Sequence, residues 1–194
     1  MIKMYNSMSA LPKALYNILK YLVTAEAAED IWKMLKYNDY HALSNPNLTM
    51  TEKLDLLWRD GKQEDYGVFF TNLIEDAMCV SKCVLKMYHY YTYARPSSYL
   101  ATPTFAFDFL YGGQMSLVEK DGIPVNRGDL FINCLLSSLN GANIGGVGTL
   151  IFDDEQSRYD AARSVVGNSK TFTGVQIYLS TLMGDTGAEV GCGS

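Results

Sequence analysis

Residues 104–111 read Thr104-Phe105-Ala106-Phe107-Asp108-Phe109-Leu110-Tyr111, and this stretch decides the fold. Aromatic side chains stand at every second position, and Thr104, Ala106 and Asp108 alternate with them. Because successive side chains of a strand point to opposite faces, a period of two predicts a β-strand with one buried face. The glycine pair at 112–113 ends this strand.

Four further strands are predicted around this one. Residues 79–94 are rich in Val and Tyr and stop at Arg95-Pro96, which predicts a long strand. The polar residues between it and 104–111 fit the loop of a hairpin. Residues 154–166 are polar, and we interpret them as partly helical. The other predicted strands are 68–71, 147–152 and 172–183.

Three short helices are predicted before the sheet. Leucine and isoleucine recur through residues 11–22 at i, i+4, i+7, i+8 and i+11, so they share one face of a helix. Similar spacing over 25–37 predicts a second helix, with Thr24 as its N-cap. Thr49 and Glu52 have the spacing of a capping box, which predicts the start of a third helix.

The order of these elements predicts the fold class. A last helix over 130–139 closes at Asn140-Gly141, between the third and fourth strands of the chain. We therefore predict an α+β fold, in which an antiparallel sheet has a helix packed on one face and follows an N-terminal helical prefix. Residues 1–60 are the predicted prefix, 67–184 the predicted α+β domain, and 185–194 a flexible, Gly-rich tail.

Length and composition exclude several classes of protein. The chain has 194 residues, 48% of them hydrophobic and 19% charged, so it buries a core and is not disordered as a whole. A net charge of -5 gives no general field that attracts nucleic acid. We expect no membrane span and no signal peptide, because the apolar stretches are short and interrupted. The four cysteines are expected to be free thiols in a reducing cytosol.

The residues that carry chemistry are few and scattered. His41 and His89 have no cysteine or second histidine at metal-ligand spacing, and Cys79 and Cys83 lack the second pair of a zinc site. The Gly-rich run 141–148 closes a helix and enters a strand, whereas a phosphate-binding loop follows a strand and opens a helix. We therefore expect no catalytic residue, metal or cofactor, and predict that the protein is not an enzyme.

Charged residues near the last strands suggest contacts with a neighbouring subunit. An acidic run at 153–155 is followed closely by Arg158, Asp160 and Arg163. Adjacent residues of an extended segment point in opposite directions, so this run is a poor metal site. We interpret these residues as a solvated loop whose charged groups pair at the rim of an interface between subunits.

Tyrosine is the informative excess in the composition. The chain has 14 tyrosines, and Tyr88, Tyr90, Tyr91 and Tyr93 lie close together in the long predicted strand. Tyrosine is enriched at interfaces because its ring is apolar and its hydroxyl is polar. Aromatic residues on both faces of this strand predict that both faces are covered. A neighbouring subunit is the natural cover, and a helix of the prefix is the alternative. We predict these four tyrosines as interface anchors.

The segment from Trp32 to Gly184 resembles structural proteins of tailed bacteriophages at the head–tail junction. The resemblance rests on Trp32-Lys33-Met34-Leu35-Lys36-Tyr37, Ala42-Leu43-Ser44-Asn45-Pro46-Asn47-Leu48-Thr49, Glu52-Lys53, Val68-Phe69-Phe70, Gly145-Gly146-Val147-Gly148-Thr149-Leu150 and Ser157-Arg158-Tyr159-Asp160. The strand and helix order after the prefix is also similar to the tail-terminator and neck-ring fold. That resemblance implies a homo-oligomeric ring, commonly a hexamer. The helical prefix is a departure from the small members of that family.

We therefore expect a virion structural protein of the neck, a tail-terminator or head-completion subunit. Its expected partners are copies of itself and neighbouring portal-adaptor or tail-tube proteins, around a channel that passes DNA without specific binding. It would be made in the host cytoplasm, would bind no membrane and would reside at the head–tail junction. The rivals are a small-ligand-binding or enzymatic domain, which would show a pocket with converging polar groups, and an adaptor that binds its partner as a monomer.

Overall fold

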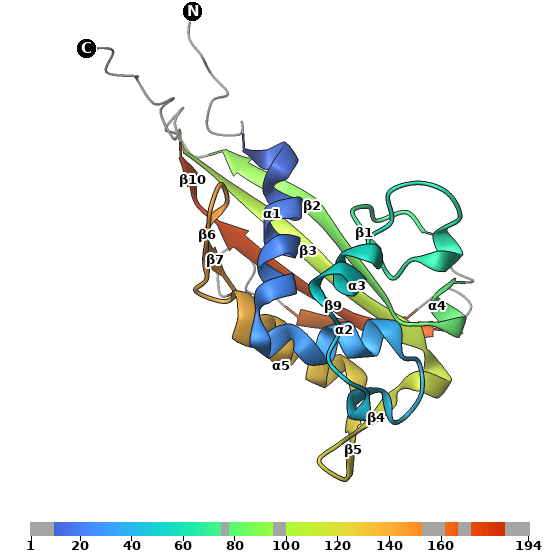
Figure 1. The fold of residues 1–194 in the computed structure, drawn as a ribbon. Coiled ribbons are helices and arrows are strands. Elements are labelled where there is room, and N and C mark those ends of the chain that lie inside the picture. The colour runs from blue at the N-terminus through green and yellow to red at the C-terminus, as the bar shows by residue number, and fades with distance from the viewer. Residues whose placement is uncertain (1–9, 75–77, 95–99, 153–161, 167–171, 185–194) are drawn as a thin grey trace, which may run out of the picture.

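The computed structural model describes residues 10–74, 78–94, 100–152, 162–166 and 172–184. It confirms the α+β class, because helices come first in the chain and a twisted sheet follows them (Figure 1). The helices are α1 (Leu11–Thr24), α2 (Glu29–Lys36), α3 (Met50–Asp55), α4 (Met78–Ser81) and α5 (Arg127–Leu139). Short 3₁₀ turns lie at Glu26–Ala28, Ala42–Ser44, Gln63–Asp65 and Gly113–Met115. The predicted tail, 185–194, lies outside the described residues.

The main sheet has the strand order β1-β2-β3-β9-β7-β6, with β8 paired to β9 and β10 paired to β3. Among the described strands every pairing is antiparallel except that of β1 with β2. A separate hairpin of two strands, β4 and β5, stands apart from this sheet (Figure 1). The strands are β1 (Val68–Phe69), β2 (Val84–Ala94), β3 (Leu100–Gly112), β4 (Leu117–Lys120), β5 (Ile123–Asn126), β6 (Asn143–Ile144), β7 (Gly148–Ile151), β8 (Ala162–Val166), β9 (Phe172–Thr181) and β10 (Met183–Gly184).

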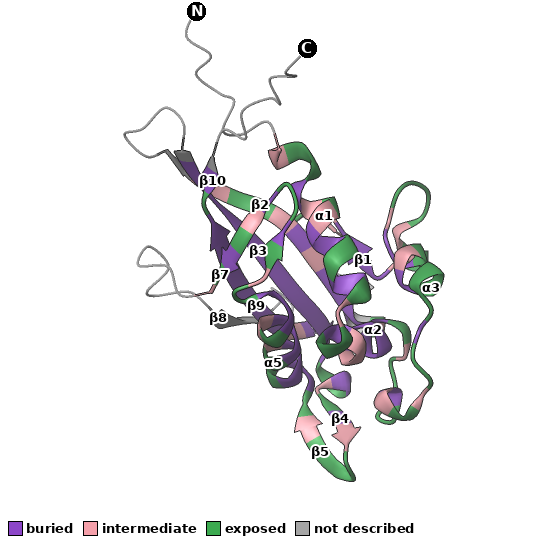
Figure 2. Ribbon diagram, turned by 60° about the vertical axis from the view of Figure 1, so that its left-hand side comes forward, coloured by how far each residue is buried: buried purple, intermediate pink, exposed green. Residues whose placement is uncertain are grey.

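Helices α1, α2 and α5 lie over one face of the sheet (Figures 1 and 2). Ile18 of α1 and Trp32 of α2 belong to the same hydrophobic cluster as Phe107 of β3 and Phe131 of α5. The rings of Phe109 and Phe131 stack with centroids 4.5 Å apart. The helical prefix and the sheet therefore share one core, and we call the face that they cover together the helix face.

A smaller cluster packs on the other face of the sheet, at the end where β2 begins. It consists of Phe69, Cys79, Val84, Leu110 and Phe172. The central strand β3 is therefore buried on both faces, and every residue from 101 to 112 is buried. The prediction of one buried face for this strand was too narrow, because the residues between its aromatic positions are covered as well.

The strand predicted over 79–94 begins later than expected. Residues 78–81 form the short helix α4, and the strand starts at Val84. Cys79 and Cys83 therefore do not share a strand face: Cys79 lies in the small cluster and Cys83 in the main core. A short apolar run fits a buried helical turn as well as a strand, so periodicity alone could not separate the two.

The N-terminal helices confirm one cap and correct another. Thr24 is the last residue of α1, where its hydroxyl donates to the Tyr21 carbonyl at 2.9 Å, so its prediction as the N-cap of the second helix was wrong. The predicted capping box is confirmed, since the Thr49 backbone N–H donates to Glu52 Oε2 at 2.8 Å and the Glu52 N–H donates back to Thr49 Oγ1 at 3.3 Å.

Two later segments differ from the prediction. Residues 162–166, expected to be partly helical, form strand β8, and 153–161 lie outside the described residues. The β4–β5 hairpin was not predicted. Its turn is Asp121-Gly122, both with positive φ (54° and 79°), which is the backbone of a two-residue hairpin turn. Each of its strands has only four residues, too few for a clear alternation.

Candidate functional site

Three polar residues stand side by side across the middle of the sheet, on the face opposite the helix face. Lys86 of β2 pairs in register with Asp108 of β3, which pairs with Gln176 of β9. We call these three residues the charged row. Asp108 and Gln176 are buried, with only 3% and 5% of their surface exposed. Burying a carboxylate costs free energy unless it is paired and hydrogen-bonded, so the Asp108 side chain needs partners that offset this cost.

The Asp108 carboxylate has donors on both of its oxygens. Lys86 Nζ lies 3.0 Å from Asp108 Oδ2, and the Tyr88 hydroxyl donates to the same oxygen at 3.2 Å. Gln176 Nε2 donates to Asp108 Oδ1 at 2.6 Å. The Tyr178 hydroxyl donates to Gln176 Oε1, which continues the network along β9. The charged row is therefore a connected network in which Asp108 is the central acceptor.

Burial raises the pKa of the Tyr88 hydroxyl far above its ordinary value, and the negative charge of Asp108 raises it further. The hydroxyl therefore stays protonated at neutral pH and acts as a hydrogen-bond donor. A tyrosine held in this way is a structural group. It is not poised to act as a base, because a general base needs a pKa near the working pH.

This shift in the pKa of Tyr88 predicts a loss of stability at alkaline pH. Above about pH 10 the unfolded chain releases the Tyr88 proton while the folded chain retains it, so the free energy of unfolding falls as pH rises. Urea titrations from pH 9 to 11 should show a shallower fall for Tyr88→Phe than for the native chain. Burial also raises the pKa of Tyr111, but Tyr111 is present in both proteins, so it cancels in the comparison. Equal slopes would contradict the prediction.

A β-bulge gathers the tyrosines of β2 on the face of the charged row. His89 pairs with Phe105 and Tyr91 with Thr104, so Tyr90 is an extra residue between them. Tyr88 and Tyr91 therefore lie on the same face, although three positions separate them. The Tyr90 ring lies 5.4 Å from that of Tyr91.

The fourth ring of this group comes from β9. Tyr178 lies on the same face as Tyr88, since both residues pair with Ala106, and its ring centroid is 4.8 Å from that of Tyr90. We call Tyr88, Tyr90, Tyr91 and Tyr178 the tyrosine cluster. Tyr178 is buried, whereas Tyr90 is 52% exposed. The cluster thus presents an aromatic surface held from beneath by hydrogen bonds.

This arrangement corrects the expectation that aromatic side chains occupy both faces of the strand. A regular strand would place Tyr91 on the face opposite Tyr88 and Tyr90. The bulge places all three residues on one face. The helix face of β2 instead carries His89, whose ring lies 6.2 Å from that of Phe105. Because α1 and α2 pack on the helix face with Phe105, the described helices of the prefix do not cover the tyrosine cluster.

The structure gives strand positions for two of the other predicted interface residues. Tyr93 of β2 pairs with Thr102 of β3, and Arg163 of β8 pairs with Gln176 of β9. Arg158 and Asp160 lie outside the described residues. Since β2 and β8 lie on opposite sides of β3 and β9, the predicted tyrosines and Arg163 are placed at opposite edges of the sheet and not together.

Sequence reasoning missed most of the charged row. The available signal was an aspartate in the middle of an aromatic strand, because a buried charge requires a partner. Which residues meet Asp108 depends on the register of β2 and β9, and that register is set by long-range pairing. Gln176 and Tyr178 lie 68 and 70 positions further along the chain, a separation over which the sequence alone does not specify a contact.

The histidines lie apart from this site. His41 Nδ1 is 2.7 Å from Glu119 Oε2, which links the loop after α2 to the β4–β5 hairpin. His89 Nε2 is 2.7 Å from the Thr92 hydroxyl, and both residues are on the same strand. Within the described part of the chain, no group of three or more His, Cys, Asp or Glu residues is arranged to hold a metal ion.

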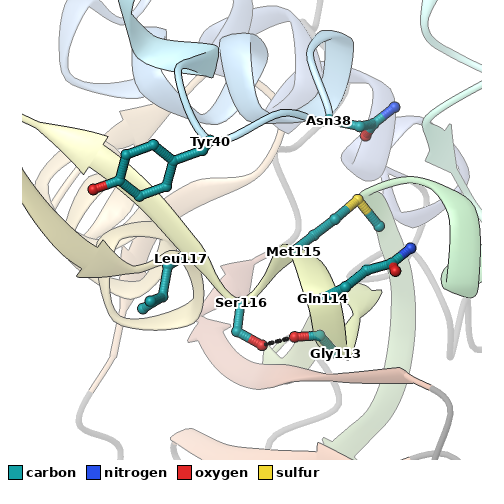
Figure 3. A pocket seen from close by; sticks show the side chains of 7 residues that line it. All are labelled: Asn38, Tyr40, Gly113, Gln114, Met115, Ser116 and Leu117. Atoms are coloured by element: carbon teal, nitrogen blue, oxygen red, sulfur yellow. Dashed lines mark hydrogen bonds between the residues drawn. The ribbon is translucent and has the colours of Figure 1, made fainter.

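A pocket of about 330 Å³ lies beside the base of the β4–β5 hairpin. Its lining residues are Asn38, Tyr40, Gly113, Gln114, Met115, Ser116 and Leu117 (Figure 3). None of them carries a charge, and the Ser116 hydroxyl is already bonded to the Gly113 carbonyl. The pocket therefore has room for a small molecule, but its lining lacks a group that transfers protons at neutral pH.

Comparison with known proteins gives one match. A family model described as YomW matches residues 28–181. Neither the curated proteins nor the solved structures yielded a match. A search of the described helices for a segment long and apolar enough to cross a membrane found none.

Proposed function

The chain belongs to the YomW family, and because the family model spans α2 and the sheet through β9, we propose one function for helices and sheet together. We propose that this unit is a bacteriophage virion structural protein of the head–tail neck. It would act as a ring subunit of the tail-terminator or head-completion type, joining connector and tail. Its activity on this view is binding, with no bond made or broken.

The tyrosine cluster is the observation that carries the proposal. It lies on the sheet face that α1 and α2 leave uncovered, and it combines a half-exposed aromatic ring at Tyr90 with hydroxyls that are already hydrogen-bonded. The Tyr90 ring buries apolar area on association at little cost in side-chain entropy, since the rings of Tyr91 and Tyr178 hold it. Aromatic anchors of this kind dominate the affinity of many protein interfaces.

The proposed partners are other copies of this chain in a ring, in the manner of a hexamer, and neighbouring portal-adaptor or tail-tube proteins of the virion. Each copy adds a net charge of -5, so a ring accumulates negative charge. Negative charge around a channel repels the phosphates of DNA, which allows the genome to pass without sticking. The resemblance to bacteriophage structural proteins of the head–tail junction and the negative net charge both support this part of the proposal.

Replacing Tyr90 by serine tests the proposal. We expect Tyr90→Ser to lower the particle mass measured by mass photometry from that of the ring toward that of the monomer. Because the variant lacks an interface anchor, its rings should dissociate at protein concentrations at least ~10-fold higher than those at which native rings dissociate. The matched control is Tyr16→Ser, because Tyr16 is 41% exposed on α1, away from the cluster. An unchanged oligomer for Tyr90→Ser, or a native chain that is monomeric, would overturn the proposal.

A further inference from the structure

The two outer edges of the main sheet lie on opposite sides of β3 and β9, and among the described strands each has backbone positions that pair on one side only. At one edge, β1 pairs with β2 only at Leu85 and Lys86, and within the described residues the rest of β2 has no partner on that side. At the other edge, β8 pairs with β9 alone among the described strands. Strand edges with free backbone groups are templates for pairing with another chain.

The direction of the backbone groups on β2 follows from one hydrogen bond. The Leu85 N–H donates to the Gly67 carbonyl at 2.8 Å, so it points away from β3. Because the peptide groups of a strand alternate in direction, the N–H and C=O of His89 also point toward this outer edge. His89 and Tyr90 are exposed, so the edge is open to solvent there. The bulge at Tyr90 interrupts the regular spacing, and an incoming strand would pair with residues 91–94 beyond it.

We propose that the β8 edge of one copy lies along the β2 edge of the next, so that the sheet continues from subunit to subunit. The inference rests on the proposed function and identifies the two surfaces that meet. A contact between opposite edges is head-to-tail. Repeated contacts of this type form a ring where the rotation between copies closes and an open filament where it does not, whereas pairing of two identical edges stops at a dimer. The proposed contact also places the neighbouring strand beside Tyr90 and Tyr91, at the border of the tyrosine cluster.

Cross-linking with paired cysteines tests the contact. In a Cys192→Ser background, the double variant Thr92→Cys/Ser164→Cys places one cysteine on β2 and one on β8, and the three other native cysteines are buried. Within one copy, β2 and β8 are three strand spacings apart, which is roughly 14 Å. A bismaleimide with a shorter span should therefore link cysteines of neighbouring copies only. We expect a ladder of covalent oligomers up to the ring size. A mixture of the two single variants should give dimers only.

Matched controls separate the inference from the proposed function. The double variant Thr92→Cys/Tyr16→Cys carries its second cysteine on α1 and should give no ladder. Dimers formed by Thr92→Cys alone would show pairing of identical edges and overturn the inference. A double variant that forms a ring of native mass but gives no cross-links between β2 and β8 would also overturn the inference, although the proposed function would stand. A double variant and native chain that are both monomeric would remove the proposed function and the inference together.

Discussion

Replacing Gly174 by alanine is expected to prevent stable folding, with a loss of at least about 3 kcal/mol in the free energy of unfolding. Gly174 pairs with Leu110 across the β3–β9 ladder and with Val165 of β8 on its other side. A Cβ atom at Gly174 would overlap the Phe109 carbonyl oxygen and come within 2.9 Å of Leu110 Cα. Both are backbone atoms in the centre of the sheet, so they cannot move aside as a flexible side chain would.

Gly145→Ala is the matched control for this experiment. A Cβ atom at Gly145 meets no atom within 4 Å, and the residue does not have the positive φ that disfavours alanine. We expect its free energy of unfolding to stay within about 0.5 kcal/mol of the native value. Chemical denaturation followed by far-UV circular dichroism measures both variants. A Gly174→Ala protein as stable as Gly145→Ala would show that β3 and β9 are not packed as closely as described.

Replacing Asp108 by alanine is expected to reduce the free energy of unfolding by about 3–5 kcal/mol, the cost of leaving a buried charge without its partner. The change removes the acceptor that Lys86, Tyr88 and Gln176 share. Lys86 and Tyr88 would then be half-buried without this acceptor, whereas Gln176 Nε2 would keep the Tyr88 hydroxyl as an acceptor at 2.9 Å. Urea denaturation of the native and variant chains measures the difference, and a loss below about 1 kcal/mol would contradict the central role of Asp108.

A double variant separates the cost of an orphaned charge from the value of the ion pair itself. Lys86→Met/Asp108→Leu removes both charges, keeps the unbranched shape at position 86 and the branched shape at position 108, and so is expected to be clearly more stable than Asp108→Ala. The same comparison should report on assembly. If the charged row serves to hold the tyrosine cluster in place, the double variant should keep its fold and lose ring mass in mass photometry, which distinguishes a role in positioning from a role in stability.

The helical elements could be predicted from the sequence because their signals are local. The apolar spacing of α1 and the capping box at Thr49 each depend on residues within one or two turns, and the structure confirms both. The end of α5 at Asn140 followed by Gly141, which has a φ of 79°, is likewise a local signal. The hairpin of β2 and β3 was predicted for the same reason, since alternation and a polar loop occur within one stretch.

The site could not be predicted to the same extent, because its signals are not local. An aspartate at position 108 indicates that a partner exists, but Gln176 becomes that partner only through the β3–β9 register. The bulge at Tyr90 is likewise not visible in a run of tyrosines, because the sequence does not show which residue of the run is unpaired. The expected interface residues were therefore placed on both faces of β2, whereas the strand carries Tyr88, Tyr90 and Tyr91 on one.

The extra residue in β2 also suggests how such a surface could arise during evolution. Strand pairing is intact on both sides of Tyr90, with His89 opposite Phe105 and Tyr91 opposite Thr104. Insertion or deletion of a single codon at this point would add or remove an aromatic ring without shifting any core residue from its partner. Selection could thus change how strongly this surface binds without changing the hydrophobic core. The binding face and the core could therefore evolve separately.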